Sequence, residues 1–67
     1  MKSVAVFTAL ALEMARNRET QQTLAELIGV DRATVNRKMV GQREFTRSEM
    51  FCIAEHYGKT VDELFRI

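Results

Sequence analysis

The sequence has little of what builds disulfide-bonded, metal-binding or membrane proteins. Its 67 residues include no proline, no tryptophan, three glycines, one cysteine and one histidine. Cys52 alone cannot form an internal disulfide, and Cys52 with His56 is too small a set for a zinc site. No run of about 18 residues lacks charge, so no transmembrane helix is predicted. We therefore expect no metal, no cofactor and no membrane partner.

The patterns of an enzyme are missing as well. The sequence has no paired carboxylates beside a nucleophile and no glycine-rich phosphate loop, so catalysis is not expected. The length predicts one domain, residues 1–67, and a hydrophobic share of 46% is ordinary for a soluble globular protein. Residues 1–12 have the outline of a short signal peptide, but cleavage would remove a whole helix. We therefore expect a cytoplasmic, nucleoid-associated protein.

Apolar residues recur at three- and four-residue spacing, which predicts an all-α fold, a compact bundle of about five short helices. The helices are expected at residues 3–18, 20–28, 32–40, 46–57 and 60–65. Their starts carry N-cap residues, Ser3, Thr20, Asp31, Thr46 and Thr60. Three of their ends carry a glycine, Gly29, Gly41 and Gly58. Residues 3–7 are the one segment where an extended alternative stays open, because two of them are β-branched.

Charge is spread unevenly along the chain. Residues 32–47 hold five basic residues and one acidic residue, which gives a local charge of +4. The basic residues of this stretch are Arg32, Arg37, Lys38, Arg43 and Arg47. Residues 48–67 hold two basic and four acidic residues, a local charge of −2. One face is therefore expected to meet a polyanion such as nucleic acid, unless these charges only solvate a helix surface.

The segment 21–40, QQTLAELIGVDRATVNRKMV, carries the most specific signal. Ala25 is small where two helices would cross, Gly29 allows a tight turn between them, and Val35 can fill the core below the second helix. With these residues the segment resembles the helix-turn-helix of the phage Cro/CI-type repressors, the XRE-like family. The similarity continues through IAEHYG at 53–58 and TVDELF at 60–65. It implies a lambda-repressor-like DNA-binding domain with its helix-turn-helix at 21–40.

The sequence departs from the family's pattern in three places. Met14 and Met39 stand where many members have a buried Arg–Glu ion pair, and an apolar pair can replace such an ion pair without leaving a lone charge. Lys38 stands where an apolar residue is usual, so either its stem packs while its amine reaches out, or the helix end is rotated. Residues 17–19 replace a turn that commonly contains glycine. The first helix is therefore expected to be longer and placed differently than in relatives.

The resemblance implies that the helix at 32–40 enters the major groove of DNA. The residues expected at base edges are Arg32, Ala33, Asn36 and Arg37. Each arginine could bind guanine through two hydrogen bonds, Asn36 could read adenine, and the Ala33 methyl could touch a thymine methyl. The alternative is that both arginines only hold phosphates.

The remaining polar residues of this region are expected at the DNA backbone. They are Thr20, Gln21, Thr34, Lys38, Arg43 and Arg47. By the resemblance, Gln21 would bond a phosphate and brace a base-reading side chain, while Thr20 joins it or serves only as an N-cap. Thr34 either contacts DNA or packs, and Lys38, Arg43 and Arg47 are otherwise ordinary surface charges.

The function that this pattern indicates is a sequence-specific regulator of transcription that binds double-stranded DNA, of the phage or prophage repressor type (Cro or CI). We expect a homodimer on a palindromic operator, joined through the C-terminal helices or the apolar first helix. The alternative is an antitoxin-like or antirepressor-binding module that binds a protein through its first helix and contacts DNA secondarily. The chain ends soon after the fifth helix, so a Cro-size protein and an excised DNA-binding domain both fit.

Overall fold

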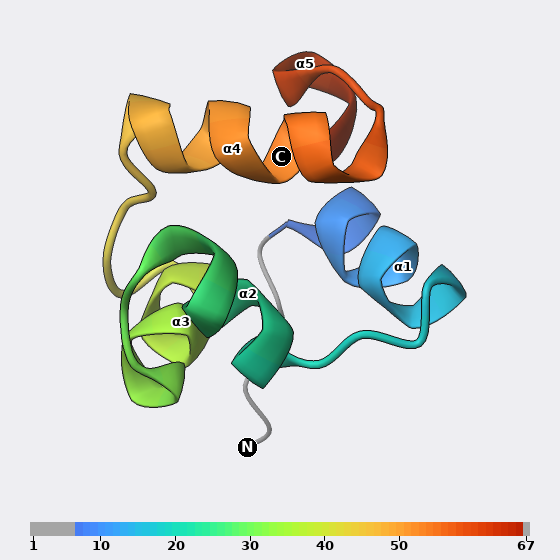
Figure 1. Cartoon of the computed structure of the whole chain (residues 1–67). Helices are drawn as coiled ribbons and strands as arrows, with labels where there is room; N and C mark the ends of the chain where they lie inside the picture. Colours follow the sequence, from blue (N-terminus) through green and yellow to red (C-terminus); the bar gives the residue numbers. More distant parts are fainter. Residues whose placement is uncertain (1–6, 67) are drawn as a thin grey trace.

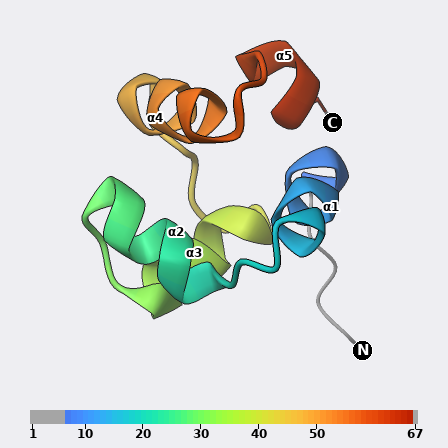
Figure 2. The same ribbon diagram turned by 45° about the vertical axis from the view of Figure 1, so that its right-hand side comes forward.

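The computed structural model describes residues 7–66, and this part of the chain contains five helices and no strand. The helices are α1 (Thr8–Arg16), α2 (Gln21–Ile28), α3 (Arg32–Met39), α4 (Arg47–Tyr57) and α5 (Val61–Leu64). The prediction of an all-α bundle of about five short helices is confirmed. Figures 1 and 2 show α4 and α5 at one end of the molecule, α2 and α3 at the other, and α1 along one side. Ser3 and the rest of segment 3–6 lie outside the described residues.

The first helix ends two residues before the predicted boundary, and the reason is the backbone of Arg18. Arg18 adopts a left-handed conformation with φ of 56°. Its amide donates to the carbonyl of Ala15 at 3.1 Å, and the Glu19 amide donates to the carbonyl of Met14 at 2.9 Å. This is the Schellman pattern that usually places glycine at the left-handed position. Because arginine holds that position here, the sequence offers no signal for the end of the helix.

The other helix ends follow the predicted capping residues closely. The Asp31 carboxylate accepts the Thr34 amide at 2.7 Å and so caps α3. Both expected capping boxes are present, at the starts of α4 and α5. Gly29 and Gly58 adopt φ of 74° and 65° where α2 and α4 end. Predicted side-chain caps therefore hold three of the five helix starts, those of α3, α4 and α5, whereas Thr20 precedes α2 without a side-chain bond and α1 begins at Thr8 after the uncapped Phe7.

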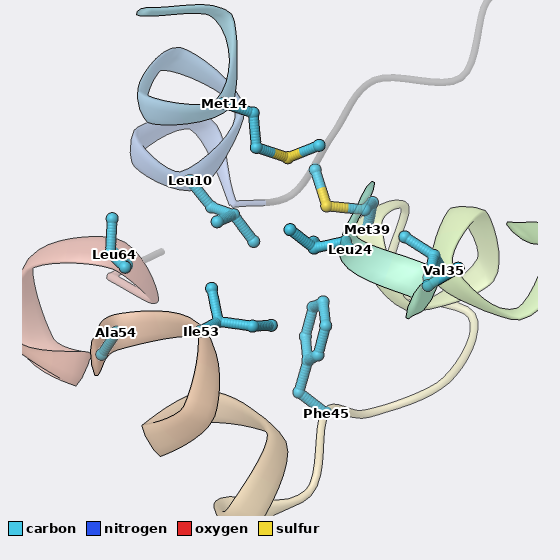
Figure 3. Packing of buried hydrophobic residues seen from close by; sticks show 10 residues of the cluster. Leu10, Met14, Leu24, Val35, Met39, Phe45, Ile53, Ala54 and Leu64 are labelled. Carbon is cyan, nitrogen blue, oxygen red and sulfur yellow. The ribbon is translucent and has the colours of Figure 1, made fainter. Parts of the chain in front are cut away.

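The core lies where the five helices converge (Figure 3). Its buried residues are Leu10, Met14, Leu24, Ala25, Val35, Met39, Phe45, Ile53, Ala54 and Leu64. Met14 from α1 and Met39 from α3 are 6% and 4% exposed, and their side chains point toward one another. This apolar pair leaves no charge to be compensated between α1 and α3.

Phe45 was expected in a connecting loop, yet it belongs to the core. It is 7% exposed, and its ring meets Phe65 at 5.1 Å and Phe7 at 5.6 Å in edge-to-face geometry. Phe7 and Phe65 also meet each other, at 5.3 Å. The three rings tie together the start of α1, the segment before α4 and the end of α5. A single apolar residue in a polar loop has no periodicity, so the sequence pattern could not reveal this cluster.

Candidate nucleic-acid interface

The segment predicted as a helix-turn-helix forms two helices packed against each other. Ala25 on α2 is 1% exposed and Val35 on α3 is fully buried, so small and apolar residues occupy the crossing. Gly29 turns the chain with its left-handed backbone, and the Val30 amide donates to the carbonyl of Ala25 at 3.0 Å. The bonded turn fixes the start of α3 relative to α2.

The face of α3 that lies opposite its buried side is polar and exposed. Val35 and Met39 point into the core, as the sequence predicted. All four residues expected at base edges are exposed on the outer face: Arg32, Ala33, Asn36 and Arg37. The helix therefore presents two guanidinium groups, one amide and one methyl group to solvent.

A hydrogen bond joins the two helices across this surface. The Gln21 side chain at the start of α2 donates from Nε2 to Oδ1 of Asn36 at 3.2 Å. Because the bond fixes one edge of the Asn36 amide, its Nδ2 group and the second lone pair of Oδ1 keep a defined direction. The structure thus brings together the two residues that sequence reasoning placed at a phosphate and at a base.

The start of α2 has unused hydrogen-bonding groups. Thr20 is exposed and extended, and its hydroxyl makes no bond to the helix. No acidic residue lies in the first turn of α2. The first amides of a helix lack intrahelical partners and carry the positive end of its dipole, which favours an anion. This end of α2 can therefore hold a phosphate next to the exposed face of α3.

Arg43 is placed beside the end of α3 by backbone bonds. The amides of Gln42 and Arg43 both donate to the carbonyl of Arg37, at 2.8 and 3.3 Å. The pKa of Asp31 is lowered first by its hydrogen bonds with Thr34, and the positive charges of Arg37 and Arg43 lower it further. Arg37 and Arg43 therefore contribute positive charge to the same region of the surface.

Two other residues expected at the DNA backbone have contrasting environments. Arg47 is exposed at the first position of α4. Thr34 is half-buried, and its amide is occupied by the cap with Asp31. The side chain of Arg47 is therefore accessible to an anion, whereas that of Thr34 is only partly accessible.

Lys38 differs from the expectation that it lines the flanking phosphates. Its side chain is 6% exposed, and its ammonium bonds the Glu49 carboxylate at 2.5 Å and the Glu44 carbonyl at 3.4 Å. The ammonium also lies 5.8 Å from the centre of the Phe45 ring. Burial would raise the pKa of Glu49, but its bonds with Lys38 and Thr46 lower it overall. The stem of Lys38 packs, as in the first of the two alternatives, but its amine reaches Glu49 on α4 and not the solvent.

The exposed charge of this surface is accordingly smaller than the sequence suggests. Four arginines are exposed, Arg32, Arg37, Arg43 and Arg47, and Glu44 is the exposed acid among residues 32–47. These five residues carry a net charge of +3. Lys38 adds nothing to it, because its charge is buried and paired with Glu49. The surface remains positive, and it borders the free start of α2.

A second polar cluster escaped sequence reasoning because its members are far apart in the chain. His56 Nε2 lies 3.0 and 3.1 Å from the two carboxylate oxygens of Glu19, and the Tyr57 hydroxyl donates to Glu19 at 2.6 Å. The Tyr57 bond is the main cause that lowers the pKa of Glu19. Burial raises the pKa of Tyr57, and the bond with Glu19 raises it further. The cluster fastens the turn before α2 to the end of α4.

Among residues 7–66, two large apolar side chains are exposed on other helices than α3. Leu12 on α1 and Phe51 on α4 are each 60% exposed. Phe51 borders a shallow groove between α4 and α5, together with Cys52, Glu55 and Val61. Within residues 7–66 no group of three His, Cys, Asp or Glu could hold a metal ion. No helix in the same part of the chain has the length and apolar character needed to cross a membrane.

Comparison with known proteins gives one family. The family model described as the BetR domain matches residues 4–67, and so includes all five helices and the candidate interface. The match is to a small helical family of DNA-binding type, and it does not assign the chain to the Cro/CI-type repressors. No curated protein and no solved structure matches the chain significantly.

Proposed function

The chain belongs to the BetR domain family, and from this premise we propose that it is a sequence-specific regulator of transcription. In this proposal α3 enters the major groove of double-stranded DNA, and the protein acts as a repressor of the Cro or CI type. The observation that carries the proposal is the outer face of α3. Arg32, Asn36 and Arg37 are exposed there, and Gln21 of α2 holds the Asn36 side chain by a hydrogen bond.

The side chains of this face suit the base edges of the major groove. The guanidinium groups of Arg32 and Arg37 can each donate two hydrogen bonds to guanine. Asn36 can accept from and donate to adenine, because its Oδ1 has a second lone pair beside the bond from Gln21. Each such pair discriminates against a wrong base by about 1–3 kcal/mol. The methyl group of Ala33 adds a contact for thymine.

Phosphate contacts would fix the register of α3 in the groove. The free amides at the start of α2, with Thr20 and Gln21, form one contact region. Arg43 and Arg47 form a second region beyond the end of α3. Contacts on both sides of the recognition helix orient a protein on the duplex without reading its sequence.

We propose a homodimer on a palindromic operator. α3 has eight residues, so it is about 12 Å long and reaches only a few base pairs. Two copies one helical turn apart would double the sequence that is read. Leu12 and Phe51 are the exposed apolar side chains that such an association could bury.

The test is selection from a pool of random duplex DNA with the purified protein, followed by sequencing. We expect a palindrome with half-sites about 34–36 Å apart. Arg37→Ala and Asn36→Ala should each lose the preference at particular positions of the half-site. Arg16→Ala is the matched control, because Arg16 is 72% exposed on α1 and should leave the motif unchanged. Weak, salt-sensitive binding without enrichment would contradict the proposal, since it would mean that the arginines only follow phosphates.

The exposed Leu12 supports a second candidate function. An antitoxin-like or antirepressor-binding module would use the apolar surface of α1 for a protein partner and bind DNA secondarily. Purification from the native host distinguishes the two candidates. A stoichiometric partner that is lost in Leu12→Ser would favour the module, whereas a homodimer without a partner would count against it.

A further inference from the structure

The buried ammonium of Lys38 has an arrangement that the proposed function does not yet use. Lysine has three donors, and two of them are directed at the Glu49 carboxylate and the Glu44 carbonyl. The Phe45 ring lies beside the same group. A buried charge is costly to desolvate, and a packed apolar residue of similar volume is often as stable. Stability alone is therefore a weak reason for a lysine at this position.

What the lysine adds is a bond to the backbone of the segment between α3 and α4. Among the described residues, Lys38 is the side chain that bonds the backbone of residues 41–45, through the carbonyl of Glu44. The Glu49 oxygen that Lys38 bonds also accepts the Thr46 amide at 3.0 Å, as part of the capping box of α4. One carboxylate thus connects α3 to the first turn of α4 and to the end of the segment.

Arg43 lies between two fixed points of this segment. On one side its amide donates to the carbonyl of Arg37, at the end of α3. On the other side the carbonyl of the next residue, Glu44, is held by Lys38. The Arg43 side chain itself is exposed. The two bonds leave the guanidinium free for a partner while restricting the backbone that carries it.

We infer that Lys38 is a positioning residue for DNA binding: with Glu49 it holds segment 41–45 so that Arg43 contacts a DNA phosphate. The inference rests on the proposed function, and it gives Lys38 an indirect role in place of a phosphate contact of its own. Without the bond to Glu44, the segment has more conformations, and the Arg43 contact costs more entropy to form.

The experiment compares four proteins: the wild type, Arg43→Ala, the double variant Lys38→Met/Glu49→Gln, and the triple variant. The double variant removes one positive and one negative charge, so the net charge and the long-range attraction to DNA are unchanged. Glutamine also serves at this position of a capping box, so α4 keeps its cap. The measurement is the affinity for the selected duplex between about 50 and 200 mM salt, with circular dichroism as the check of folding.

Loss of one phosphate contact lowers the slope of log K against log salt by about 0.9. The proposed dimer carries two copies of Arg43, so its slope should change by about 1.8, and over this salt range the wild type should lose about 12-fold more affinity than Arg43→Ala. We expect the slope of the double variant to change by the same amount as that of Arg43→Ala. The slope of the triple variant should change no further. A second double variant, Lys38→Leu/Glu49→Gln, removes the same two charges and the same bond to Glu44, and its slope should change by the same amount. This variant keeps the test decisive if the first double variant does not fold.

Three results would overturn the inference. An unchanged slope in Arg43→Ala would remove the contact that Lys38 is said to position. A wild-type slope in a folded double variant would show that the Lys38–Glu49 pair is not needed. Additive losses in the triple variant would show that the two act independently. If the wild type binds the selected duplex no better than other duplexes, the proposed function itself is refuted.

Discussion

Replacing Phe45 by alanine should destabilise the domain severely while leaving its surface chemistry intact. Phe45 is 7% exposed and contacts two aromatic rings edge-to-face. Truncating a buried phenylalanine to alanine costs about 3–5 kcal/mol, and the two ring pairs account for about 0.5–1.5 kcal/mol each. At about 0.05–0.15 kcal/mol per residue, a domain of 67 residues has a total stability of about 3–10 kcal/mol. The substitution therefore removes a third of that stability or more.

Urea unfolding followed by circular dichroism measures this change. Phe51→Ala is the control, because Phe51 is the same residue type but 60% exposed, and its loss should change the unfolding free energy by less than about 0.5 kcal/mol. The melting temperature of Phe45→Ala should fall by at least about 12 °C. A loss below about 1 kcal/mol, or an equal loss in Phe51→Ala, would refute the view that the three rings close the domain.

Three further predictions concern local features. Gly29→Ala should lower the free energy of unfolding in urea by about 1–2 kcal/mol, because φ is 74°. No atom lies near the added methyl, so this cost comes from the backbone alone, and an equal stability would show that the backbone relaxes at no cost. Asp31→Ala should cost about 1 kcal/mol by removing the cap of α3, and restoring stability with Asp31→Ser would identify the cap as the cause. Tyr57→Phe should cost about 1 kcal/mol at neutral pH. The Tyr57 bond lowers the pKa of Glu19 below its ordinary value of 4.5, so its stabilisation is present above that pH and lost as pH falls through the lower folded pKa. The unfolding free energy of Tyr57→Phe should therefore fall less steeply below pH 4.5 than that of the wild type, and parallel pH curves would contradict this account.

The starts of α3, α4 and α5 and the exposed face of α3 were predictable because their signals are local. Thr46 and Glu49 lie three residues apart and cap the same helix, so the sequence alone identifies the pair. Val35 and Met39 fix the buried side of α3 by their four-residue spacing, and the exposed side follows from helix geometry.

The contacts that the sequence did not reveal join residues that are distant in the chain or break a local rule. Lys38 and Glu49 are 11 residues apart, and Glu19 and Tyr57 are 38 apart, so no helical spacing connects them. Arg18 ends α1 in a conformation that normally requires glycine. In each case the tertiary structure chooses a partner or a backbone angle that local propensity does not favour.

The most direct test of the central claim is the affinity of the wild type for the selected duplex and for a shuffled duplex of the same length and composition, at one salt concentration. If the exposed face of α3 reads bases, the selected duplex should bind about 10³-fold tighter or more. The difference should shrink in Arg37→Ala and Asn36→Ala by the equivalent of about 1–3 kcal/mol each per half-site. Equal affinities for the two duplexes would contradict the claim and leave only an arginine-rich surface that binds phosphates.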